Sequence, residues 1–376
     1  MSGRAATLAL ADGTLFSGFV FGAEASACGE VVFTTGMTGY QEVLTDPSYT
    51  GQIVTMTAPQ IGNTGVNAAD AESVDDRPRV AGFVMRDPSA MPSSWRSEQS
   101  LDEYLKAHNV VAIGGVDTRR LTRIIRDRGA QNGCIGTEAP EVLVERARST
   151  PSMEGLDLVA QVTPKALYRF SESRDTWSVT SPEPAPLEPH LRVVAMDFGA
   201  KRNILRCLVD IGCEVVAVPA TTPADEILAL NPDGIFLSSG PGDPAAVGYA
   251  VKTIEQLVGK RPLFGICLGH QLLALALGAK TYKLKFGHRG LNQPVKDLAT
   301  SRVEITTQNH GFVVDVDSLG GRAETTHLHL NDGTSEGLAV ADAQAFSVQF
   351  HPEAAAGPHD AVYLFDRFKR AMMRAK

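Results

Sequence analysis

The stretch Pro262-Leu-Phe-Gly-Ile-Cys-Leu-Gly-His-Gln-Leu-Leu-Ala-Leu-Ala-Leu-Gly-Ala279 decides the fold of the C-terminal half of this 376-residue chain. A short apolar strand runs through Gly265-Ile-Cys-Leu-Gly269 into an apolar helix, the G-x-nucleophile-x-G pattern with cysteine as the nucleophile. The glycines allow a sharp strand-to-helix turn, because no Cβ stands in the way. Such a turn places the Cys267 thiol at a helix N-terminus, where the helix dipole and unpaired N–H groups favour a thiolate. Cys267 is therefore the candidate nucleophile, with a buried structural cysteine as the alternative reading.

Strands and helices alternate around this turn. Strands are predicted over residues 191–196, 214–218 and 234–237, and helices over residues 203–210, 224–230 and 248–258. Such alternation, with strands rich in Val, Ile and Leu, indicates an α/β fold with a mainly parallel sheet covered by helices on both faces. Residues 281–350 are predicted to form shorter strands, and a helix over residues 360–374 closes the chain.

The N-terminal part is predicted to be a smaller, β-rich mixed domain. Its first residues alternate on both sides of Asp12-Gly13, which is a hairpin signal. Further strands are predicted in Glu30-Val-Val-Phe-Thr-Thr and Gln52-Ile-Val-Thr-Met-Thr, and Gly36-Met-Thr-Gly-Tyr-Gln-Glu-Val-Leu-Thr-Asp-Pro-Ser-Tyr49 reads as a polar connection between them. Helices are predicted over residues 101–108 and 118–128. The second carries five arginines and is most simply a solvated face, with a surface for an acidic partner as the alternative.

The domain boundary is placed where periodicity weakens, between residues 150 and 189. Ser181-Pro-Glu-Pro-Ala-Pro-Leu-Glu-Pro189 has four prolines in nine residues, which is typical of a semi-rigid linker. The predicted division is an N-terminal domain over residues 1–150, a connecting segment over 151–190 and a C-terminal domain over 191–376.

Composition excludes several classes of protein. The net charge of −8 argues against a general binder of nucleic acid or anionic membranes. No apolar run is long enough to span a bilayer, and the N-terminus lacks a signal-peptide core. The five cysteines are scattered and form no CxxC pair, so neither a disulfide framework nor a zinc site is predicted. We expect a reduced, cytoplasmic protein.

A thiol nucleophile needs a base, and His351 is the preferred candidate. It lies in Gln349-Phe-His-Pro-Glu353 at the end of a strongly β-forming segment, where Glu353 can orient its ring. Spacing alone leaves open an ordinary loop histidine beside a solvated carboxylate. His270, three residues after the cysteine, is the rival base, although its side chain is expected to pack against the sheet. His288 and His310 are loop residues or ligand contacts, and no carboxylate or cysteine spacing supports a metal at His327 and His329.

Backbone N–H groups are needed to hold the oxyanion that forms when an amide is attacked. The N–H of Leu268 is one natural donor. Ser239-Gly-Pro-Gly-Asp-Pro244, after the preceding parallel strand, is the expected source of the other, because Gly240 and Gly242 allow close backbone approach. The alternative is an ordinary strand-to-helix turn.

Taken together, the cysteine turn, the Ser-Gly-Pro-Gly loop and the Gln-Phe-His-Pro-Glu segment resemble the class I glutamine amidotransferase domain. Three more segments resemble the small-subunit family of carbamoyl phosphate synthetase: Gly29 to Tyr49, Gly114-Gly-Val-Asp-Thr-Arg-Arg-Leu-Thr and Asp197-Phe-Gly-Ala-Lys-Arg-Asn-Ile-Leu-Arg. Phe286-Gly-His-Arg-Gly and Gln308-Asn-His-Gly-Phe312 complete a likeness that spans nearly the whole chain.

The resemblance implies a glutaminase in which Cys267 attacks the glutamine amide, His351 acts as base and then acid, and Glu353 orients His351. The glutamine contacts that it implies are Ser48, Gly240, Gly242, Leu268, Gln271, Asn309, Gly311 and Phe312. No metal or cofactor is implied in this chain. The ammonia is expected to pass through a tunnel to a large synthetase subunit, which uses ATP, Mg²⁺ and bicarbonate to make carbamoyl phosphate for arginine and pyrimidine synthesis.

A few positions depart from the family's usual pattern, namely Ser239, Gln293, Ala355 and Ala356. None belongs to the implied triad. Two other functions are alternatives. A triad amidotransferase serving anthranilate or GMP synthesis lacks the Gly-Met-Thr-Gly-Tyr-Gln-Glu segment, and a non-catalytic scaffold would have lost the nucleophile, whereas Cys267 is present.

Overall fold

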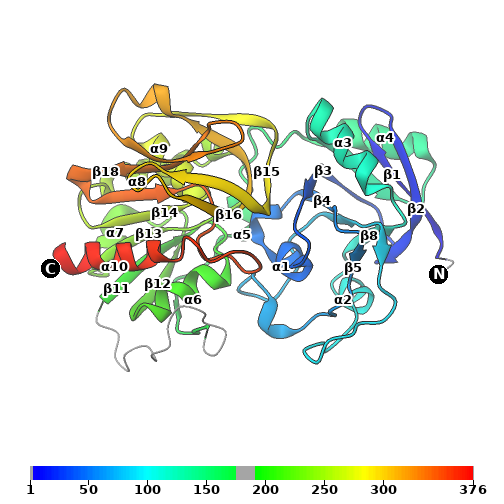
Figure 1. The fold of residues 1–376 in the computed structure, drawn as a ribbon, viewed down its shortest axis with the longest axis horizontal. Coiled ribbons are helices and arrows are strands. Elements are labelled where there is room, and N and C mark those ends of the chain that lie inside the picture. The colour runs from blue at the N-terminus through cyan, green and yellow to red at the C-terminus, as the bar shows by residue number, and fades with distance from the viewer. Residues whose placement is uncertain (1–2, 175–190, 376) are drawn as a thin grey trace. The chain divides into compact units, whose positions relative to one another are not determined.

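The computed structural model describes residues 3–174 and 191–375, so the predicted proline-rich linker lies outside the described residues. The chain divides into two units. The first comprises Met1–Glu154 and Lys285–Gly290, and the second comprises Gly155–Leu284 and Leu291–Lys376 (Figure 1).

Seven strands of the first unit close into a barrel, in the order β1-β2-β8-β6-β4-β3-β9. The predicted hairpin is confirmed: Gly13 takes a φ of 90° between β1 and β2, and Asp12 Oδ1 accepts the N–H of Thr14 at 2.8 Å. Neighbours in the series β8-β6-β4-β3 pair in parallel and the other neighbours antiparallel. The barrel confirms the predicted β-rich character of this part of the chain. The strands are β1 (Ala5–Leu10), β2 (Leu15–Gly22), β3 (Ala27–Thr34), β4 (Gln52–Met56), β6 (Gly82–Val84), β8 (Val111–Gly114) and β9 (Gln131–Gly136).

Helices α2 (Leu101–Ala107) and α3 (Thr118–Arg128) confirm the two helices predicted in the first unit. A capping box between Ser100 and Glu103 begins α2, since each side chain satisfies the other residue's backbone N–H. The five arginines of α3 are exposed as predicted, and the guanidinium of Arg120 lies 5.0 Å from the centre of the Phe16 ring. Outside the sequence predictions are α1 (Tyr40–Thr45), the 3₁₀ helix η1 (Pro47–Tyr49), α4 (Pro140–Ser149) and the short pair β5 (Gln60–Ile61) and β7 (Asp87–Pro88).

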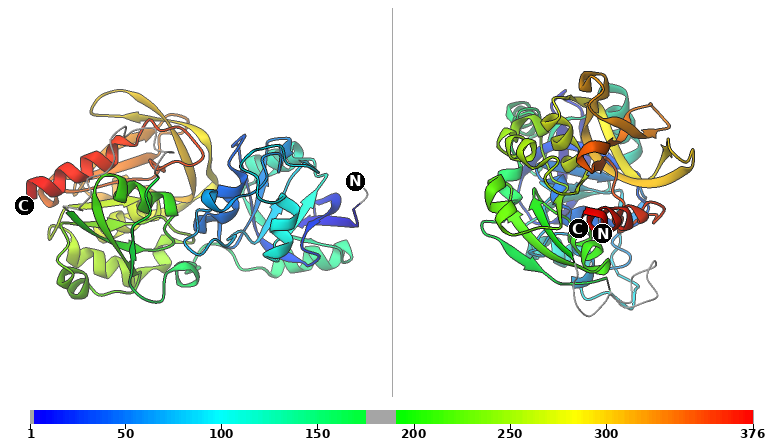
Figure 2. Two further views of the ribbon diagram at one scale, coloured as in Figure 1. Left: turned by 90° about the horizontal axis from the view of Figure 1, so that it is seen from below. Right: turned by 90° about the vertical axis from the view of Figure 1, so that its left-hand side faces the viewer.

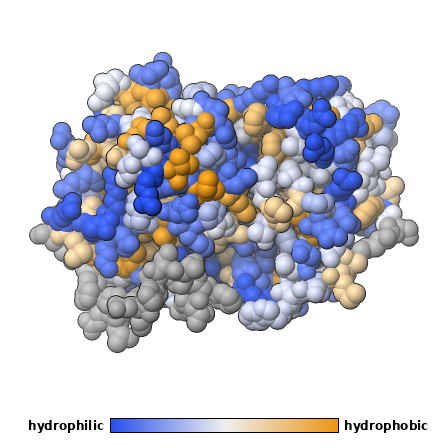
Figure 3. All heavy atoms as spheres, viewed as in Figure 1, coloured by the Kyte–Doolittle hydropathy of each residue, from blue (hydrophilic) through white to orange (hydrophobic). Residues whose placement is uncertain are grey.

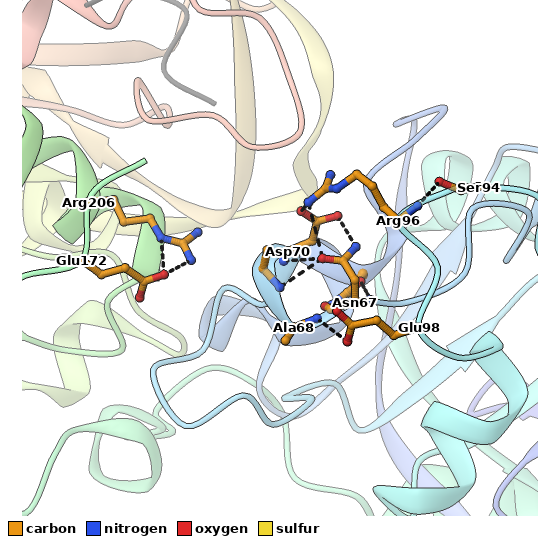
Figure 4. A network of polar contacts seen from close by, with 10 residues as sticks. Asn67, Ala68, Asp70, Ser94, Arg96, Glu98, Glu172 and Arg206 are labelled. Atoms are coloured by element: carbon orange, nitrogen blue, oxygen red, sulfur yellow. Dashed lines mark hydrogen bonds and ion pairs between the residues drawn. The ribbon is translucent and has the colours of Figure 1, made fainter. Parts of the chain in front are cut away.

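A polar network holds the loop between β4 and β6 of the first unit (Figure 4). Asn67 Oδ1 accepts the backbone N–H groups of Ala69 and Asp70, and Asp70 forms an ion pair with Arg96 at 2.6 Å. Gln41 of α1 bonds to both backbone groups of Asn67. The connection that reads as merely polar in the sequence is therefore a short helix anchored by a buried amide.

One disulfide joins two strands of the barrel, contrary to the expectation that every cysteine is reduced. Cys28 of β3 and Cys134 of β9 lie directly opposite each other in an antiparallel pair, with Cα atoms 4.1 Å apart. They are 106 residues apart in the chain, so no local spacing pattern marks them. Cys207, Cys213 and Cys267 are free and buried.

The second unit is built on a ten-stranded sheet in the order β10-β12-β11-β13-β14-β19-β18-β17-β15-β16. Strands β12, β11, β13, β14 and β19 are parallel, which confirms the predicted fold class. The strands are β10 (Tyr168–Phe170), β11 (Leu191–Asp197), β12 (Cys213–Pro219), β13 (Gly234–Leu237), β14 (Leu263–Ile266), β15 (Lys280–Asp297), β16 (Val303–Asp315), β17 (Glu324–His329), β18 (Ser335–Val340) and β19 (Ala345–Val348).

Helices cover both faces of the parallel part of this sheet, as predicted (Figure 2). One core packs α6 (Arg202–Asp210) and α10 (Tyr363–Ala375) against the sheet, and the other packs α7 (Ala224–Ala229), α8 (Gly248–Leu257) and α9 (Leu268–Ala276). A short helix, α5 (Val159–Val162), joins the second core. Hydrophilic side chains predominate on the face shown in Figure 3, with smaller apolar patches among them.

Two segments depart from the sequence predictions. Residues 155–174 belong to the second unit rather than to a connecting segment, because β10 pairs with β12 and Glu172 forms an ion pair with Arg206 of α6 (Figure 4). Strands β15 and β16 are also longer than predicted, at 18 and 13 residues. The middle of β15 groups with the first unit, where Lys285 accepts the N–H of Ala130 and Phe286 stacks on Phe33.

Within residues 3–174 and 191–375, no helix is both long and apolar enough to cross a membrane.

Candidate active site

The predicted cysteine turn forms at the carboxyl end of β14. Cys267 takes a φ of 54° and a ψ of −105°, a conformation that costs free energy for a residue with a side chain. Both flanking glycines are required by packing. A Cβ on Gly269 would lie 2.3 Å from the carbonyl oxygen of Leu237, and one on Gly265 would lie 2.8 Å from that of Gly269. The backbone is therefore held in a strained turn by close contacts that only glycine permits.

The Cys267 side chain is buried, with 2% of its surface exposed. Its N–H donates to the carbonyl oxygen of Val348 in β19 at 2.9 Å, and its Sγ lies 3.6 Å from the carbonyl oxygen of Asn309 in β16. Cys267 is also the N-cap residue of α9, so the first N–H groups of that helix point toward its side of the turn.

His351 and Glu353 follow β19, the strand next to β14 in the sheet. Because these strands are parallel, their carboxyl ends meet at the same edge, where open α/β sheets place their ligands. His351 Nδ1 lies 2.7 Å from Glu353 Oε1, and both side chains are fully buried. Within the described residues His351 Nε2 has no hydrogen-bond partner. One ring nitrogen is thus fixed by a carboxylate, and the other is left for a reacting group.

Lys201 completes this arrangement and is a residue that the sequence analysis missed. Its Nζ lies 2.7 Å from the same Oε1 of Glu353, and its side chain is only 5% exposed. Burial alone would raise the pKa of Glu353, but the charges of Lys201 and His351 and their hydrogen bonds lower it to about 2. Glu353 is therefore ionised at neutral pH. The available signal was position, since Lys201 comes four residues after β11, at the carboxyl edge of the sheet.

His270, the rival base, packs against the sheet and bonds to a residue of β19. Its ring is fully buried and its Nδ1 lies 2.9 Å from Ser347 Oγ in β19. Burial, reinforced by nearby His327, lowers the pKa of His270 to about 3, so the ring is neutral at neutral pH. The sequence expectation that His270 packs against the sheet agrees with this position.

The buried His270 ring predicts a pH dependence of stability. Its pKa is lower in the folded than in the unfolded state, so the unfolded state binds more protons and stability falls as the pH drops from about 6.5 toward 3. The slope from this one group approaches about 1.4 kcal/mol per pH unit. We expect His270→Gln to flatten the curve of unfolding free energy between pH 6.5 and 4, measured by urea unfolding. The matched control is His108→Gln at the exposed end of α2, and an equal flattening there would contradict the assignment.

The Ser-Gly-Pro-Gly loop lies against the start of α9. A Cβ on Gly240 would lie 2.8 Å from Leu268 Cδ2 and 2.3 Å from the carbonyl oxygen of Phe198, and Gly242 takes a φ of 92°. Glycine is thus needed at both positions, one for close approach and one for the turn. As the first residue of α9, Leu268 has no intrahelical acceptor for its N–H. The loop and the helix start are the two backbone elements expected for an oxyanion site.

The remaining predicted contacts in the second unit also come together. Gln271 Nε2 donates to the carbonyl oxygen of Phe312 at 2.7 Å and to Gln349 Oε1 at 2.9 Å. Asn309, Gly311 and Phe312 all lie on β16, whose Asn309 carbonyl faces the thiol. The β16 segment is thereby tied to the cysteine turn from two sides.

Ser48 lies in the first unit, in η1. Asp46 caps this turn by accepting the Ser48 N–H at 2.8 Å. The Ser48 side chain is 8% exposed, and among the described residues its hydroxyl has no hydrogen-bond partner. A buried hydroxyl left without a partner is consistent with a ligand contact.

His310 and two of the departing positions, Ser239 and Gln293, have structural contacts. His310 bonds to the Phe312 carbonyl and to Gln308 Oε1, each at 2.9 Å. Ser239 is fully buried and bonds the carbonyl oxygen of Gly199 at 3.5 Å, and Gln293 Oε1 lies 3.2 Å from His329 Nε2.

Comparison with known proteins defines the class. Residues 194–371 match the family described as "Glutamine amidotransferase class-I". Residues 8–135 match "Carbamoyl-phosphate synthase small chain, CPSase domain". The carbamoyl phosphate synthase small chain of Syntrophotalea carbinolica is 58% identical over 98% of this chain and 97% of its own length. That of Thermosynechococcus vestitus is 57% identical over the same shares. The chain belongs to the carbamoyl phosphate synthase small-chain family.

Family membership settles one of the alternatives. The N-terminal match belongs to the small-chain family, so an amidotransferase for anthranilate or GMP synthesis is excluded.

Proposed function

We propose that this chain hydrolyses L-glutamine through a thioester on Cys267 and delivers the ammonia to a large synthase chain. The observation that carries this proposal is a series of buried polar contacts, in which Lys201 pairs with Glu353 and Glu353 bonds to His351. The series ends at the same sheet edge as the cysteine turn. His351 Nε2 is the end of the series that has no protein partner among the described residues.

The chemistry follows from these positions. The Cys267 thiolate adds to the amide carbon of glutamine, and the backbone N–H groups of Leu268 and the Gly240 loop hold the oxyanion that forms. His351, protonated on taking up the thiol proton, passes that proton to the nitrogen that leaves as ammonia. It then draws a proton from water, which attacks the glutamyl thioester and releases glutamate. Glu353 stabilises the imidazolium, because its carboxylate stays ionised beside Lys201.

The glutamine itself is assigned to the contacts that the family resemblance implies, seven in the second unit and Ser48 in the first. We place its contacts at Ser48, Gly240, Gly242, Leu268, Gln271, Asn309, Gly311 and Phe312. The orphan hydroxyl of Ser48 and the glycines that admit close backbone approach support this assignment.

The ammonia is assigned to a large chain because the relatives are named as small chains of a synthase. In this proposal the large chain binds ATP and Mg²⁺ and combines ammonia with bicarbonate to form carbamoyl phosphate, in the cytoplasm, for arginine and pyrimidine synthesis. This chain then needs no metal or cofactor for its own step.

Covalent trapping tests the glutaminase assignment. A glutamine-analogue electrophile should modify Cys267 with a stoichiometry near one, read by mass spectrometry of the labelled peptide, and excess L-glutamine should protect it. Cys213 should stay unmodified, because burial raises the pKa of its thiol to about 12. The control variant Cys213→Ala should label like the unmodified chain.

A different pattern of labelling would overturn the proposal. Labelling that glutamine does not slow, or labelling shared among Cys207, Cys213 and Cys267, would indicate ordinary thiol reactivity. No labelling at all would favour the alternative of a non-catalytic scaffold subunit.

A further inference from the structure

A cavity lies between α10 and the antiparallel part of the sheet in the second unit. Its volume is about 610 Å³, within the range of small-molecule sites. None of its lining residues belongs to the candidate active site. We call it the α10 groove, and the residues used below are Asp297, Glu324, His327, Phe346, Arg367, Arg370 and Arg374.

Three arginines form one wall of the α10 groove. Arg367, Arg370 and Arg374 are spaced i, i+3 and i+7 on α10, so they share one face of the helix. No ion pair involves Arg370 or Arg374 within residues 3–174 and 191–375. Two lining carboxylates, Asp297 and Glu324, oppose three guanidinium groups, which leaves one net positive charge. Asp297 is already bonded to the Thr300 hydroxyl at 2.8 Å, so it is engaged elsewhere.

The opposite wall is apolar. The side chains that line it at the surface are Ala299, Ala339, Val340 and Ala341. The Phe346 ring lies buried beneath, with the guanidinium of Arg367 4.4 Å from its centre and the Phe264 ring stacked on it at 4.4 Å. A ligand with an apolar body therefore has the alanines and Val340 to cover.

His327 supplies a buried polar atom to the same groove. Only 2% of its surface is exposed, and its Nδ1 lies 2.8 Å from Thr326 Oγ1. Its Nε2 has no hydrogen-bond partner among the described residues. Burial lowers the pKa of His327 to about 4, against the opposing effect of Asp297 and with the help of Arg367, so the ring is neutral at neutral pH. When the Thr326 hydroxyl donates to Nδ1, Nε2 carries the proton and is a donor without an acceptor. Orphan buried groups of this kind indicate a missing partner.

We propose that the α10 groove binds a small organic phosphate monoester. The phosphoryl oxygens accept from Arg370 and Arg374, the apolar body covers the alanines and Val340, and His327 Nε2 donates to a polar atom of the body. A phosphate is favoured over a carboxylate because two unpaired guanidinium groups present more forked donors than one carboxylate can accept. This site is separate from the proposed glutaminase chemistry and does not depend on it.

Phenyl phosphate is a suitable probe, because it joins a phosphate monoester to a flat apolar body. Titration calorimetry with the full chain should show saturable binding with a dissociation constant below about 1 mM. Arg370→Ala/Arg374→Ala should weaken it at least about tenfold, since two charge-assisted contacts are lost. The matched control is Arg119→Ala/Arg123→Ala on α3, which removes two equally exposed arginines and should leave the affinity unchanged.

A second variant tests the hydrogen-bond donor without changing the number of arginines in the groove. His327→Phe keeps the groove filled and removes only the donor, so it should weaken phenyl phosphate binding while the melting temperature stays within a few degrees of the parent.

Four outcomes would overturn the proposal. One is the absence of saturable binding, and another is unchanged affinity in both the double-arginine and the His327 variants. Equal or tighter binding of benzoate would assign the groove to carboxylates instead. Equal binding of inorganic phosphate would reduce it to an ion site in which the apolar wall plays no part.

Discussion

Replacing Cys267 by alanine should abolish glutamine-dependent carbamoyl phosphate synthesis by the complex of this chain with a large synthase chain. The expected loss is on the order of 10⁴-fold or more, because without the thiol no covalent intermediate can form. Synthesis from added ammonia should be unchanged, since ammonia bypasses the step on this chain. The measurement compares the two nitrogen donors at saturating bicarbonate and ATP.

The smaller alanine side chain fits the site, because Cys267 is buried and alanine only removes the sulfur. Cys267→Ser is the matched control for size, and it should lose glutamine-dependent synthesis while keeping the ammonia-dependent rate. Loss of both activities in both variants would mean that Cys267 supports the fold or the assembly rather than the chemistry. Retention of glutamine use in the alanine variant would end the nucleophile assignment.

The second large effect is expected at Lys201, whose ammonium pairs with a fully buried carboxylate. Lys201→Met should lower the unfolding free energy by roughly 3–5 kcal/mol, because it leaves Glu353 buried with only His351 as its partner. Glutaminase activity should fall by about 10²-fold or more, because the carboxylate that orients His351 is no longer held ionised. The control Lys252→Met, at an exposed position of α8, should change neither quantity.

A double-mutant cycle separates charge pairing from packing at this site. Glu353→Gln removes the carboxylate, and Lys201→Met/Glu353→Gln removes both charges. The destabilisation of the double variant should be smaller than the sum of the single effects by about 1–3 kcal/mol. Additive effects, measured by urea unfolding, would show that the two residues do not act as a pair.

The same pair also determines how the stability of the protein falls at acid pH. The pKa of Glu353 is lowered in the folded state from an ordinary value of 4.5 to about 2, so its contribution to stability is complete above pH 4.5 and is lost as the pH falls toward 2. Lys201→Met removes the largest cause that lowers this pKa. The loss of stability on acidification should then begin at a higher pH.

Local patterns were sufficient for the architecture of the sheet and for the cysteine turn. The β–α alternation after residue 191 predicted β11, β12, β13 and β14, because buried parallel strands are continuous apolar runs. The parallel strand β19 was expected only as one of the shorter strands of residues 281–350. Gly265 and Gly269 predicted the turn because the G-x-nucleophile-x-G pattern is local in the sequence, although the contact that excludes a Cβ at Gly269 comes from Leu237 of β13. His351 and Glu353 were found because they are two residues apart and follow a strand.

Contacts between residues far apart in the chain could not be predicted from local patterns. Lys201 meets Glu353 across 152 positions of the chain (353 − 201), and its position just after β11 does not by itself identify the carboxylate that it pairs with. Cys28 and Cys134 pair only because barrel closure sets β3 opposite β9. The length of β15 and β16 was underestimated because their apolar residues are interrupted by glycine and polar residues, whereas tertiary pairing keeps the strands extended.

Because Lys285–Gly290 group with the barrel, neither unit is one continuous segment of the chain. The chain passes from one unit to the other at three points, after Glu154, after Leu284 and after Gly290. No single cut therefore yields either unit whole. A fragment ending at residue 154 would leave the Ala130 N–H without its acceptor on Lys285 and Phe33 without its stacking partner Phe286. The two family matches cover separate parts of the chain, yet the barrel unit takes Lys285–Gly290 from within the second match, so the boundaries of the two families are not the boundaries of the two units.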